Sequence, residues 1–360
     1  MAYERKNIHA MAAYVPGEQI DAPGIIKLNT NENPYPPSPA VSQALADCDV
    51  ARLRQYPSPT ARKLRDAIAA RHGLSAENVI VTNGGDELLR MAIATFVEVS
   101  EKVAVARPTY TLYQVLTAAH GCEMINFELD DQYQLPENYT DLLNSSGARL
   151  TFLVNPHAPS GTLTDINTIA ELAAGYGGVL LLDEAYIDFV APELAYDSSQ
   201  LVRDHDNVLI LRTFSKGYSL AGLRMAYGLA SPALIGPLMK TKDSYNTDLI
   251  SQALALASLQ DQDYASQTWR AVRDERDRVT TGLRKLGFAV PDSQSNFVLA
   301  TVPGKSGDGA GEAERIYLAL KDQGILVRYF KQEDRLQDKL RITIGSPEDN
   351  QRLLDALAEL

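Results

Sequence analysis

A lysine with hydroxyl and arginine neighbours is the first residue of this sequence that could do covalent chemistry. Lys216 follows the apolar run 208–211 and lies in the sequence RTFSKGYSLAGLR of residues 212–224. A lysine amine becomes a nucleophile, and can form a Schiff base with a carbonyl group, when burial or nearby cations lower its pKa. Most single lysines are ordinary surface residues, so this interpretation depends on the residues that accompany Lys216.

A carboxylate, Asp183, follows a second apolar run at 178–182. Such a residue could cap a helix, bind a metal or hold a proton on a nitrogen atom. An apolar run that ends in Asp-Glu is also similar to the Mg²⁺-binding element of phosphate-cleaving NTPases, which need a Gly-x-x-x-x-Gly-Lys-Ser/Thr loop. The sequence has Gly-Lys-Ser only at 304–306, with Leu299 where the first glycine of that loop would stand. We therefore reject the NTPase interpretation and predict no metal site.

The sequence NGGDE at 83–87 favours an anion site. It follows a short strand pattern at 78–81 and opens an amphipathic helix. Backbone N–H groups at a helix N-terminus bind anions, and glycine allows the anion to approach closely. The glycine pair could equally serve only the turn, and Asp86 could serve only as a helix cap. The motif is therefore informative only in combination with the other residues.

Together these residue types describe a site for pyridoxal phosphate (PLP), which has a carbonyl, a phosphate, a phenolic oxygen and a pyridine nitrogen. Lys216 would bond to the carbonyl carbon. Asp183 would keep the pyridine nitrogen protonated, and Tyr186 would reach the phenolic oxygen. The residues predicted to hold the phosphate are Gly85, Asp86, Ser215 and Arg224.

The elements that must position these residues are predicted strands that alternate with helices. Nearly continuous apolar strands of this kind indicate a mostly parallel sheet covered by helices on both faces, which is an α/β fold. In such sheets ligands bind beyond the carboxyl ends of the strands. Besides the Lys216 stretch, polar or glycine-rich turns follow strands at 82–87, 107–110, 155–161 and 183–186.

The chain is predicted to have three parts. Residues 41–250 form the large domain with the mostly parallel sheet. Helical and hairpin-like patterns over 251–360 predict a smaller α+β domain. Residues 1–40 have four prolines between positions 34 and 39, which exclude a helix there, and we expect them to form an arm that packs with the smaller domain.

Composition argues against several classes of protein. The chain has 360 residues, of which 45% are hydrophobic, and a net charge of −12, which disfavours a nucleic-acid or anionic-membrane partner. No apolar run reaches the roughly 18 residues of a membrane helix, and the first residues lack a signal-peptide pattern. Cys48 and Cys122 form no spaced motif, which is typical of a reducing compartment. We therefore expect a cytoplasmic protein.

Ten short motifs occur along nearly the whole chain. They are LNTNENP (28–34), QYP (55–57), NGGDE (83–87), PTY (108–110), DEAY (183–186), SK (215–216), AGLR (221–224), SNF (295–297), GILVR (324–328) and LRIT (340–343). Each motif alone is weak. The ordered set resembles the fold-type-I PLP-dependent aminotransferases and, among them, the histidinol-phosphate aminotransferase family.

The resemblance implies a transamination in two halves, with Lys216, Asp183 and Tyr186 as the catalytic residues. Lys216 carries the cofactor and then moves a proton from the substrate's Cα. The expected amino donor is L-histidinol phosphate, which becomes imidazole-acetol phosphate. The expected acceptor is 2-oxoglutarate, which becomes glutamate, as a step of histidine biosynthesis.

The resemblance also implies which residues bind the small-molecule substrates. Arg341 would grip the substrate's anionic group bidentately, a task suited to a guanidinium, and Arg328 and Tyr14 would assist it. Without the resemblance, Arg341 would be interpreted as an ion-paired strand residue. Tyr110 would bind the cofactor or substrate, or serve only as a core tyrosine. Aromatic amino-acid aminotransferases and threonine-phosphate decarboxylases share the fold, so the sequence leaves the substrate open.

The family further implies a homodimer in which Tyr56 reaches the cofactor phosphate of the neighbouring subunit. Proteins with this fold also serve as transcriptional regulators, but these carry an additional DNA-binding domain. Here the enzyme motifs cover nearly the whole chain, and its negative net charge disfavours DNA binding. We therefore expect an enzyme.

The sequence departs from the family at one position. The family usually has Asn-Pro-Thr-Gly after the strand at 150–154, and its Asn contacts the cofactor's phenolic oxygen. Here the aligned residues are 158–161, so Ala158 stands in place of that Asn. An alanine side chain cannot donate a hydrogen bond. We expect Asn155, or else His157, to take this place, or Tyr186 to make the contact alone.

Overall fold

The computed structural model describes residues 3–20, 22–304 and 309–360, and within these residues the larger of two β-sheets has seven strands. They lie in the order β2-β8-β7-β6-β5-β3-β4, and only β8 is antiparallel to its neighbours. The predicted α/β fold with a mostly parallel sheet is confirmed. The strands are Val79–Thr82 (β2), Lys102–Arg107 (β3), Glu123–Glu128 (β4), Ala148–Val154 (β5), Val179–Asp183 (β6), Val208–Thr213 (β7) and Ala226–Ala230 (β8).

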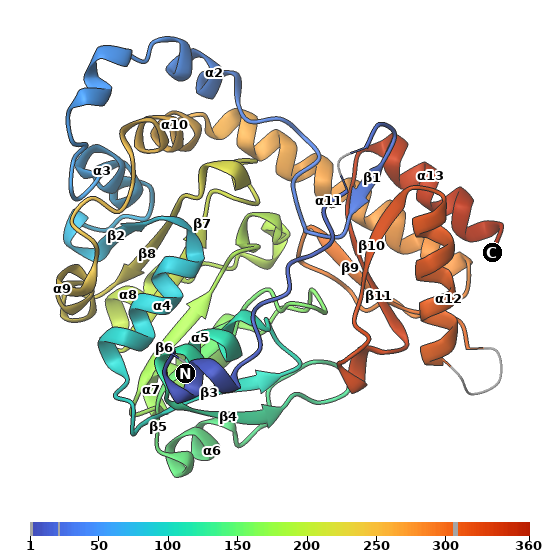
Figure 1. The fold of residues 1–360 in the computed structure, drawn as a ribbon, viewed down its shortest axis with the longest axis horizontal. Coiled ribbons are helices and arrows are strands. Elements are labelled where there is room, and N and C mark those ends of the chain that lie inside the picture. Colours follow the sequence, from blue (N-terminus) through green and yellow to red (C-terminus); the bar gives the residue numbers. More distant parts are fainter. Residues whose placement is uncertain (1–2, 21, 305–308) are drawn as a thin grey trace.

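Side chains of this sheet alternate between two hydrophobic cores. Leu180 and Leu182 of β6 pack in one core and Leu181 packs in the other. Helices cover both faces (Figure 1), which explains why the strands are apolar along their length. The first core contains α3 (Arg62–Arg71), α6 (Tyr139–Ser146), α7 (Ile166–Gly175), α8 (Ser199–Asp204) and α10 (Leu249–Gln260), and the second contains α4 (Gly84–Phe96), α5 (Leu112–His120) and α9 (Pro232–Thr241). No helix in the described residues is long and apolar enough to cross a membrane.

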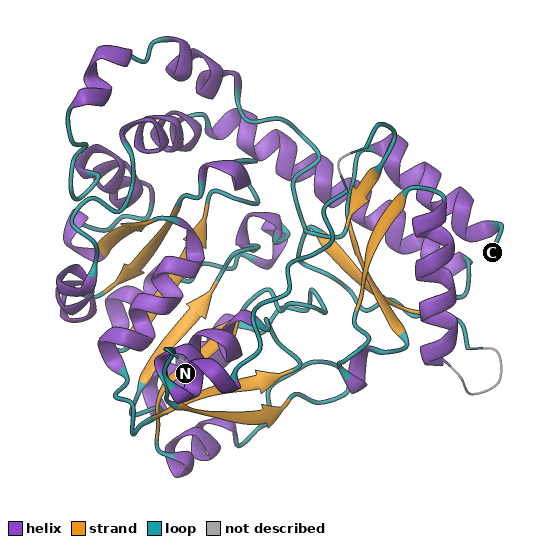
Figure 2. Cartoon of the chain, viewed as in Figure 1, coloured by secondary structure: helices purple, strands orange, loops and turns teal. Residues whose placement is uncertain are grey.

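The smaller sheet lies beside the larger domain and has its own core (Figure 2). Its strand order is β1-β10-β11-β9, with β1 parallel to β10 and the other pairs antiparallel. Apolar side chains of three helices pack in that core. The strands are Ile26–Leu28 (β1), Phe297–Thr301 (β9), Ile325–Tyr329 (β10) and Lys339–Thr343 (β11), and the helices are α11 (Gln262–Lys285), α12 (Gly309–Asp322) and α13 (Pro347–Ala358).

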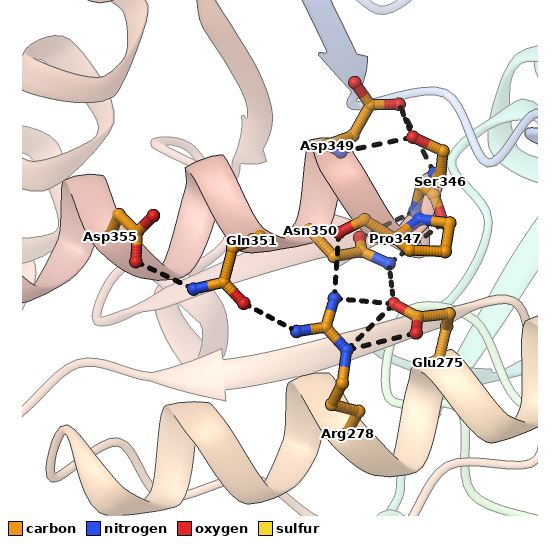
Figure 3. Close-up of polar contacts among 9 residues, drawn as sticks. Glu275, Arg278, Ser346, Pro347, Asp349, Asn350, Gln351 and Asp355 are labelled. Atoms are coloured by element: carbon orange, nitrogen blue, oxygen red, sulfur yellow. Dashed lines mark hydrogen bonds and ion pairs between the residues drawn. The ribbon is translucent and has the colours of Figure 1, made fainter.

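Polar contacts fix α13 against α11 (Figure 3). Arg278 forms an ion pair with Glu275 of the same helix at 2.8 Å and donates to the backbone oxygen of Pro347 at 3.0 Å. Glu275 in turn accepts a hydrogen bond from Asn350 Nδ2 at 2.8 Å. Because α13 directly follows β11, these contacts also help to hold that strand in place.

The N-terminal arm contacts both domains. Its strand β1 adds to the smaller sheet, with Ile26 opposite Ile325. Its first helix, α1 (Lys6–Ala10), packs instead on α5 of the larger domain. There the Arg5 guanidinium donates to the backbone oxygen of Ala119 at 2.7 Å.

Other elements differ from the sequence-based expectation. The helical pattern between Leu249 and Lys285 forms two helices, α10 and α11, rather than one, because the Asp261 side chain caps the start of α11. Strand β8 was not predicted, since its residues AYGLA are small rather than strongly apolar. A Cβ at Gly228 would lie 2.9 Å from Ile80 and Leu88, so the close packing of this strand requires glycine. The Gly-Lys-Ser stretch at 304–306 lies partly outside the described residues.

Candidate active site

A cavity of about 350 Å³ lies between the two sheets, at the carboxyl ends of the strands of the larger one. Residues 29–32 of the arm also line it. The cavity brings together residues that are far apart in the sequence, and it includes every predicted site residue except Tyr56 and Asn155. The predicted residues that line it are Tyr14, Gly85, Asp86, Tyr110, Asp183, Tyr186, Ser215, Lys216, Arg224, Arg328 and Arg341.

Lys216 lies just beyond the end of β7, with its amine pointing toward the arm. Its Nζ donates to the backbone oxygen of Thr30 at 3.0 Å. Burial, together with the nearby guanidinium of Arg341, lowers the pKa of Lys216 to about 8. The turn is fixed by Ser215, whose N–H donates to Thr213 Oγ1 at 3.0 Å. A fraction of the amine is therefore uncharged near neutral pH, as a nucleophile requires.

Reaction of Lys216 with PLP is expected to become faster as the pH rises. Only the neutral amine attacks a carbonyl, and the Lys216 pKa is about 8. The rate should therefore rise about tenfold per pH unit below about pH 7 and level off above about pH 8. Stopped-flow absorbance with excess PLP measures this rate. In Arg341→Gln, which removes a neighbouring cation, the plateau should move to higher pH, and a pH-independent rate in the wild type would contradict the assignment.

Asp183 ends β6, and both of its carboxylate oxygens accept hydrogen bonds. The Tyr113 hydroxyl donates at 2.7 Å and the backbone N–H of Ala185 donates at 3.1 Å. Burial raises the pKa of Asp183 to about 6, although the bond from Tyr113 opposes this shift. A cationic N–H group beside the carboxylate would favour its charged form. The sequence did not predict the role of Tyr113, because the contact joins residues on separate elements.

Arg224, Ser215 and the start of α4 form an anion cradle. Arg224 donates to Ser215 Oγ at 3.5 Å, and its Nη2 lies 3.6 Å from Asp86 Oδ2. Gly84 has a φ of 76°, a left-handed conformation that favours glycine, and a Cβ there would lie 2.7 Å from Arg224 Nη2. The N–H groups of the first helical turn, a hydroxyl and a guanidinium thus converge, which is the donor set of a phosphate site.

Two arginines lie side by side on adjacent strands of the smaller sheet. Arg328 of β10 is directly opposite Arg341 of β11, an arrangement in which like charges ordinarily destabilise the sheet. Nε of Arg341 is buried and has no hydrogen-bond partner in the described part of the chain. Both guanidinium carbons lie 5.7 Å from the ring centroid of Phe330. An anionic ligand bound between them would relieve the repulsion and supply the missing partner.

Tyrosine rings form another wall of the cavity. Tyr110 meets Tyr14 of the arm edge to face, with ring centroids 6.0 Å apart, and meets Tyr113 in the same way at 5.5 Å. Burial raises the pKa of Tyr110, so its hydroxyl stays neutral. Through Tyr14 the arm closes over one side of the cavity.

Asn31 is a cavity residue whose role was not predicted from the sequence. It lines the cavity, and its Nδ2 donates to the Tyr186 hydroxyl at 3.0 Å. The residue belongs to the motif LNTNENP, which marked the arm as part of the resemblance. That motif was the available signal, but it did not show which of its polar side chains reaches the site.

The structure contradicts the prediction for Asn155. Its side chain is fully buried and points away from the cavity, where Nδ2 donates to the Thr164 backbone oxygen at 3.1 Å and to the Tyr196 hydroxyl at 2.9 Å. Its Oδ1 accepts from the Thr164 N–H at 2.8 Å. All polar atoms of this amide are therefore used to fix the turn after β5.

His157 does not take the place of the missing asparagine either. Its ring is held between Ser160 Oγ at 2.6 Å and the Pro108 backbone oxygen at 2.8 Å. Burial lowers the pKa of His157 to about 4, so the ring is neutral. Ala158 does line the cavity. Of the three side chains considered for the phenolic oxygen, only Tyr186 reaches the cavity.

Tyr56 lies away from this cavity, on the outer surface of the subunit. Its side chain is 79% exposed and stacks on Tyr245, with ring centroids 4.4 Å apart. Leu45, Val50 and Leu53, on the same segment of chain, are also exposed. An exposed group of apolar side chains of this kind is typical of a protein–protein contact.

The assembled residues fit PLP in each of its functional groups. The cavity holds an amine with a lowered pKa, a buried carboxylate at a strand end, and a phosphate-type donor set at a helix start. Arg341 lines the same cavity, and its Nε, which has no hydrogen-bond partner among the described residues, is a second position suited to an anion. The arrangement can therefore hold the cofactor together with an anionic substrate.

Comparisons with known proteins agree with this geometry. The family model described as "Aminotransferase class I and II" matches residues 23–357. The chain is 44% identical over 359 residues to "Histidinol-phosphate aminotransferase 1" of Nostoc sp., covering 99% of this chain and 98% of the relative. It is 41% identical over 360 residues to the histidinol-phosphate aminotransferase of Citrifermentans bemidjiense, with 99% and 98% covered. The crystal structure of histidinol-phosphate aminotransferase from Sinorhizobium meliloti, in complex with pyridoxal-5'-phosphate, matches with a TM-score of 0.89 and 26% identity, covering 100% of this chain and 97% of that one.

Proposed function

The chain belongs to the class I and II aminotransferases, and we propose that it is a PLP-dependent enzyme that transfers the amino group of L-histidinol phosphate to 2-oxoglutarate. The observation that carries the choice of substrate is the pair of opposed arginines, Arg328 and Arg341, beside the cofactor residues. The reaction would yield imidazole-acetol phosphate and glutamate in histidine biosynthesis. The named relatives support this choice.

Residues of the larger domain would bind the cofactor at its ring nitrogen, its phosphate and its phenolic oxygen. PLP, when bound, draws electrons away from the Cα–H bond of the amino substrate that it carries, which makes that proton acidic. The Asp183 carboxylate would hold a proton on the ring nitrogen, which strengthens this effect. Arg224, Ser215 and the backbone of Gly85 would bind the phosphate. The Tyr186 hydroxyl would donate to the phenolic oxygen.

Lys216 would act twice, first as the covalent anchor of the cofactor and then as the base. Its Nζ, when it is not bonded to the cofactor, would take the proton from the substrate's Cα and would donate it again within the cavity. With a pKa of about 8, about a tenth of the amine is neutral at pH 7. The Thr30 backbone oxygen, 3.0 Å from Nζ, holds the amine within the cavity.

Arg328 and Arg341 would bind the substrate's phosphate between them. A phosphate carries close to two negative charges and accepts bidentate hydrogen bonds from guanidinium groups. A carboxylate carries one charge, so it would leave one arginine poorly compensated. The same pair would bind a carboxylate of 2-oxoglutarate in the second half-reaction. Tyr14 and Tyr110 would close the cavity around the substrate.

Paired steady-state kinetics would test the substrate assignment. With 2-oxoglutarate held constant, kcat/KM for L-histidinol phosphate should exceed that for phenylalanine by about 10- to 100-fold, since one additional charge-assisted contact contributes about 1.5–3 kcal/mol. Arg328→Gln should reduce the ratio of kcat/KM for L-histidinol phosphate to kcat/KM for phenylalanine. A kcat/KM that favours phenylalanine would make the chain an aromatic amino-acid aminotransferase. Release of CO₂ from threonine phosphate would make it a decarboxylase instead.

We also propose that the enzyme is a cytoplasmic homodimer in which Tyr56 reaches the cofactor phosphate of the partner subunit. The exposure of Tyr56, together with Leu45, Val50 and Leu53, supports a contact at this surface. Sedimentation equilibrium should give twice the monomer mass, and Tyr56→Phe should weaken PLP binding. A monomer with full PLP affinity would refute both parts. The net charge of −12 argues against a nucleic-acid partner.

A further inference from the structure

We propose that Asn31 is a positioning residue for Tyr186, and that it directs the Tyr186 hydroxyl proton to the cofactor's phenolic oxygen. The inference rests on the proposed function, because it assigns a role toward PLP. Asn31 lies in the arm, three residues after the end of β1, is 1% exposed and has a φ of 57°. Asparagine tolerates this left-handed conformation better than most residues.

Asn31 is held by hydrogen bonds to two residues of the smaller domain. Its backbone N–H donates to Thr343 Oγ1 at 3.0 Å, and its backbone oxygen accepts from Asn296 Nδ2 at 3.0 Å. Its side-chain Oδ1 accepts from Thr343 Oγ1 at 3.0 Å. Neither residue is a neighbour in sequence, so the smaller domain determines where the Asn31 amide points.

These contacts also determine which atom of the Asn31 amide faces Tyr186. Thr343 Oγ1 accepts a hydrogen bond from the Asn31 backbone, so its single proton is free to go to Oδ1. The NH₂ group must then face the Tyr186 hydroxyl, 3.0 Å away. An amide NH₂ can only donate, and the Tyr186 oxygen must therefore accept.

The consequence is that the Tyr186 proton points elsewhere. The hydroxyl donates no hydrogen bond to any residue that the structure describes. The ring cannot readily turn, because Phe297 packs against it edge to face with centroids 5.0 Å apart. Since Tyr186 lines the cavity, the unused proton is available to a ligand oxygen there.

The departure at Ala158 makes this orientation important in this chain. The resemblance implied a second side-chain donor at the phenolic oxygen, but neither Asn155 nor His157 faces the cavity. Tyr186 would be the single side-chain donor of this kind. Its orientation then controls how well the negative charge on that oxygen is stabilised, and Asn31 sets the orientation.

The first test uses the protein without PLP and labelled with ¹³Cζ-tyrosine. The Tyr186 signal is assigned as the one that disappears in Tyr186→Phe. In Asn31→Gly, which tolerates the positive φ and keeps the backbone contacts, this signal should shift, because the hydroxyl oxygen loses its donor. An unchanged Tyr186 signal would overturn the inference. This outcome does not depend on the proposed function.

The second test measures the pH midpoint of the visible chromophore that PLP forms with Lys216. A donor on the phenolic oxygen stabilises its negative charge, so losing the donor should move the midpoint to higher pH. We expect shifts of about one unit for Tyr186→Phe and about half a unit for Asn31→Gly. The double variant should match Tyr186→Phe alone, because Asn31 acts only through Tyr186.

Two further variants distinguish a change in the orientation of the Tyr186 hydroxyl from a general loosening of the arm. Thr343→Val removes the hydroxyl that fixes the amide and should shift the midpoint in the same direction as Asn31→Gly. Asn7→Ala removes a contact of the same arm away from the cavity, the hydrogen bond from Asn7 Nδ2 to the Ala118 backbone oxygen at 2.8 Å, and should leave the midpoint unchanged. Additive shifts in the double variant, or an equal shift in Asn7→Ala, would overturn the inference. Failure of wild-type protein to form any chromophore would instead overturn the proposed function.

Discussion

Lys216→Ala is expected to lose transamination by a factor of about 10⁴ or more, because a single change removes both the covalent anchor of the cofactor and the base. The visible chromophore that borohydride reduces should be lost with it. The residue lies partly buried in the cavity, with a pKa lowered to about 8, and the other cavity groups offer no second amine in the part of the chain described here.

The measurement is kcat with L-histidinol phosphate and 2-oxoglutarate, together with an absorbance spectrum in the presence of PLP. Lys240→Ala, an exposed change in α9, is the control and should behave as the wild type. Small primary amines added to Lys216→Ala should restore part of the proton transfer, which would separate loss of the base from misfolding. Normal turnover of Lys216→Ala would refute the assignment.

Asp183→Asn is expected to have the second largest effect, a fall in kcat of about 10²- to 10⁴-fold. The amide has the shape of the carboxylate, so it can still accept hydrogen bonds from Tyr113 and Ala185. It has no charge, however, and cannot hold a proton on the cofactor's ring nitrogen. The chromophore with Lys216 should still form, because that bond does not need Asp183.

Single-turnover absorbance would measure chromophore formation and the chemical step separately, so it would show whether Asp183→Asn affects only the second. Tyr113→Phe is the matched control, because it removes one hydrogen bond to Asp183 and keeps the negative charge. It should lower kcat by only about tenfold or less. A PLP analogue methylated at the ring nitrogen carries the positive charge permanently and should partly restore Asp183→Asn. Equal losses in Asp183→Asn and Tyr113→Phe would contradict the proposed role of the charge.

The main residues of the site could be predicted because strand ends meet at one edge of a parallel sheet. Lys216 and Asp183 each follow a strongly apolar strand, and these strands, β7 and β6, are neighbours in the sheet. The glycine pair that opens α4 could be predicted in the same way. The fold and the donor set of the cofactor site therefore follow from local patterns together with general rules of sheet topology.

The remaining contacts could not be predicted because they depend on side-chain direction over long separations. Asn155 was chosen since it lies in the correct turn, but its amide faces inward and satisfies the turn itself. Asn31 reaches Tyr186 across 155 positions in the sequence, and Tyr113 reaches Asp183 across 70. No periodic pattern encodes such pairs, because packing of separate elements determines which atoms meet.

The half-reaction with L-histidinol phosphate tests the central claim most directly. PLP-loaded protein is mixed with this donor in the absence of 2-oxoglutarate, and the visible spectrum is recorded together with the amount of keto product. We predict that the visible band disappears and that about one equivalent of imidazole-acetol phosphate forms per cofactor. A band that L-histidinol phosphate leaves unchanged, while an aromatic amino acid bleaches it, would contradict the account.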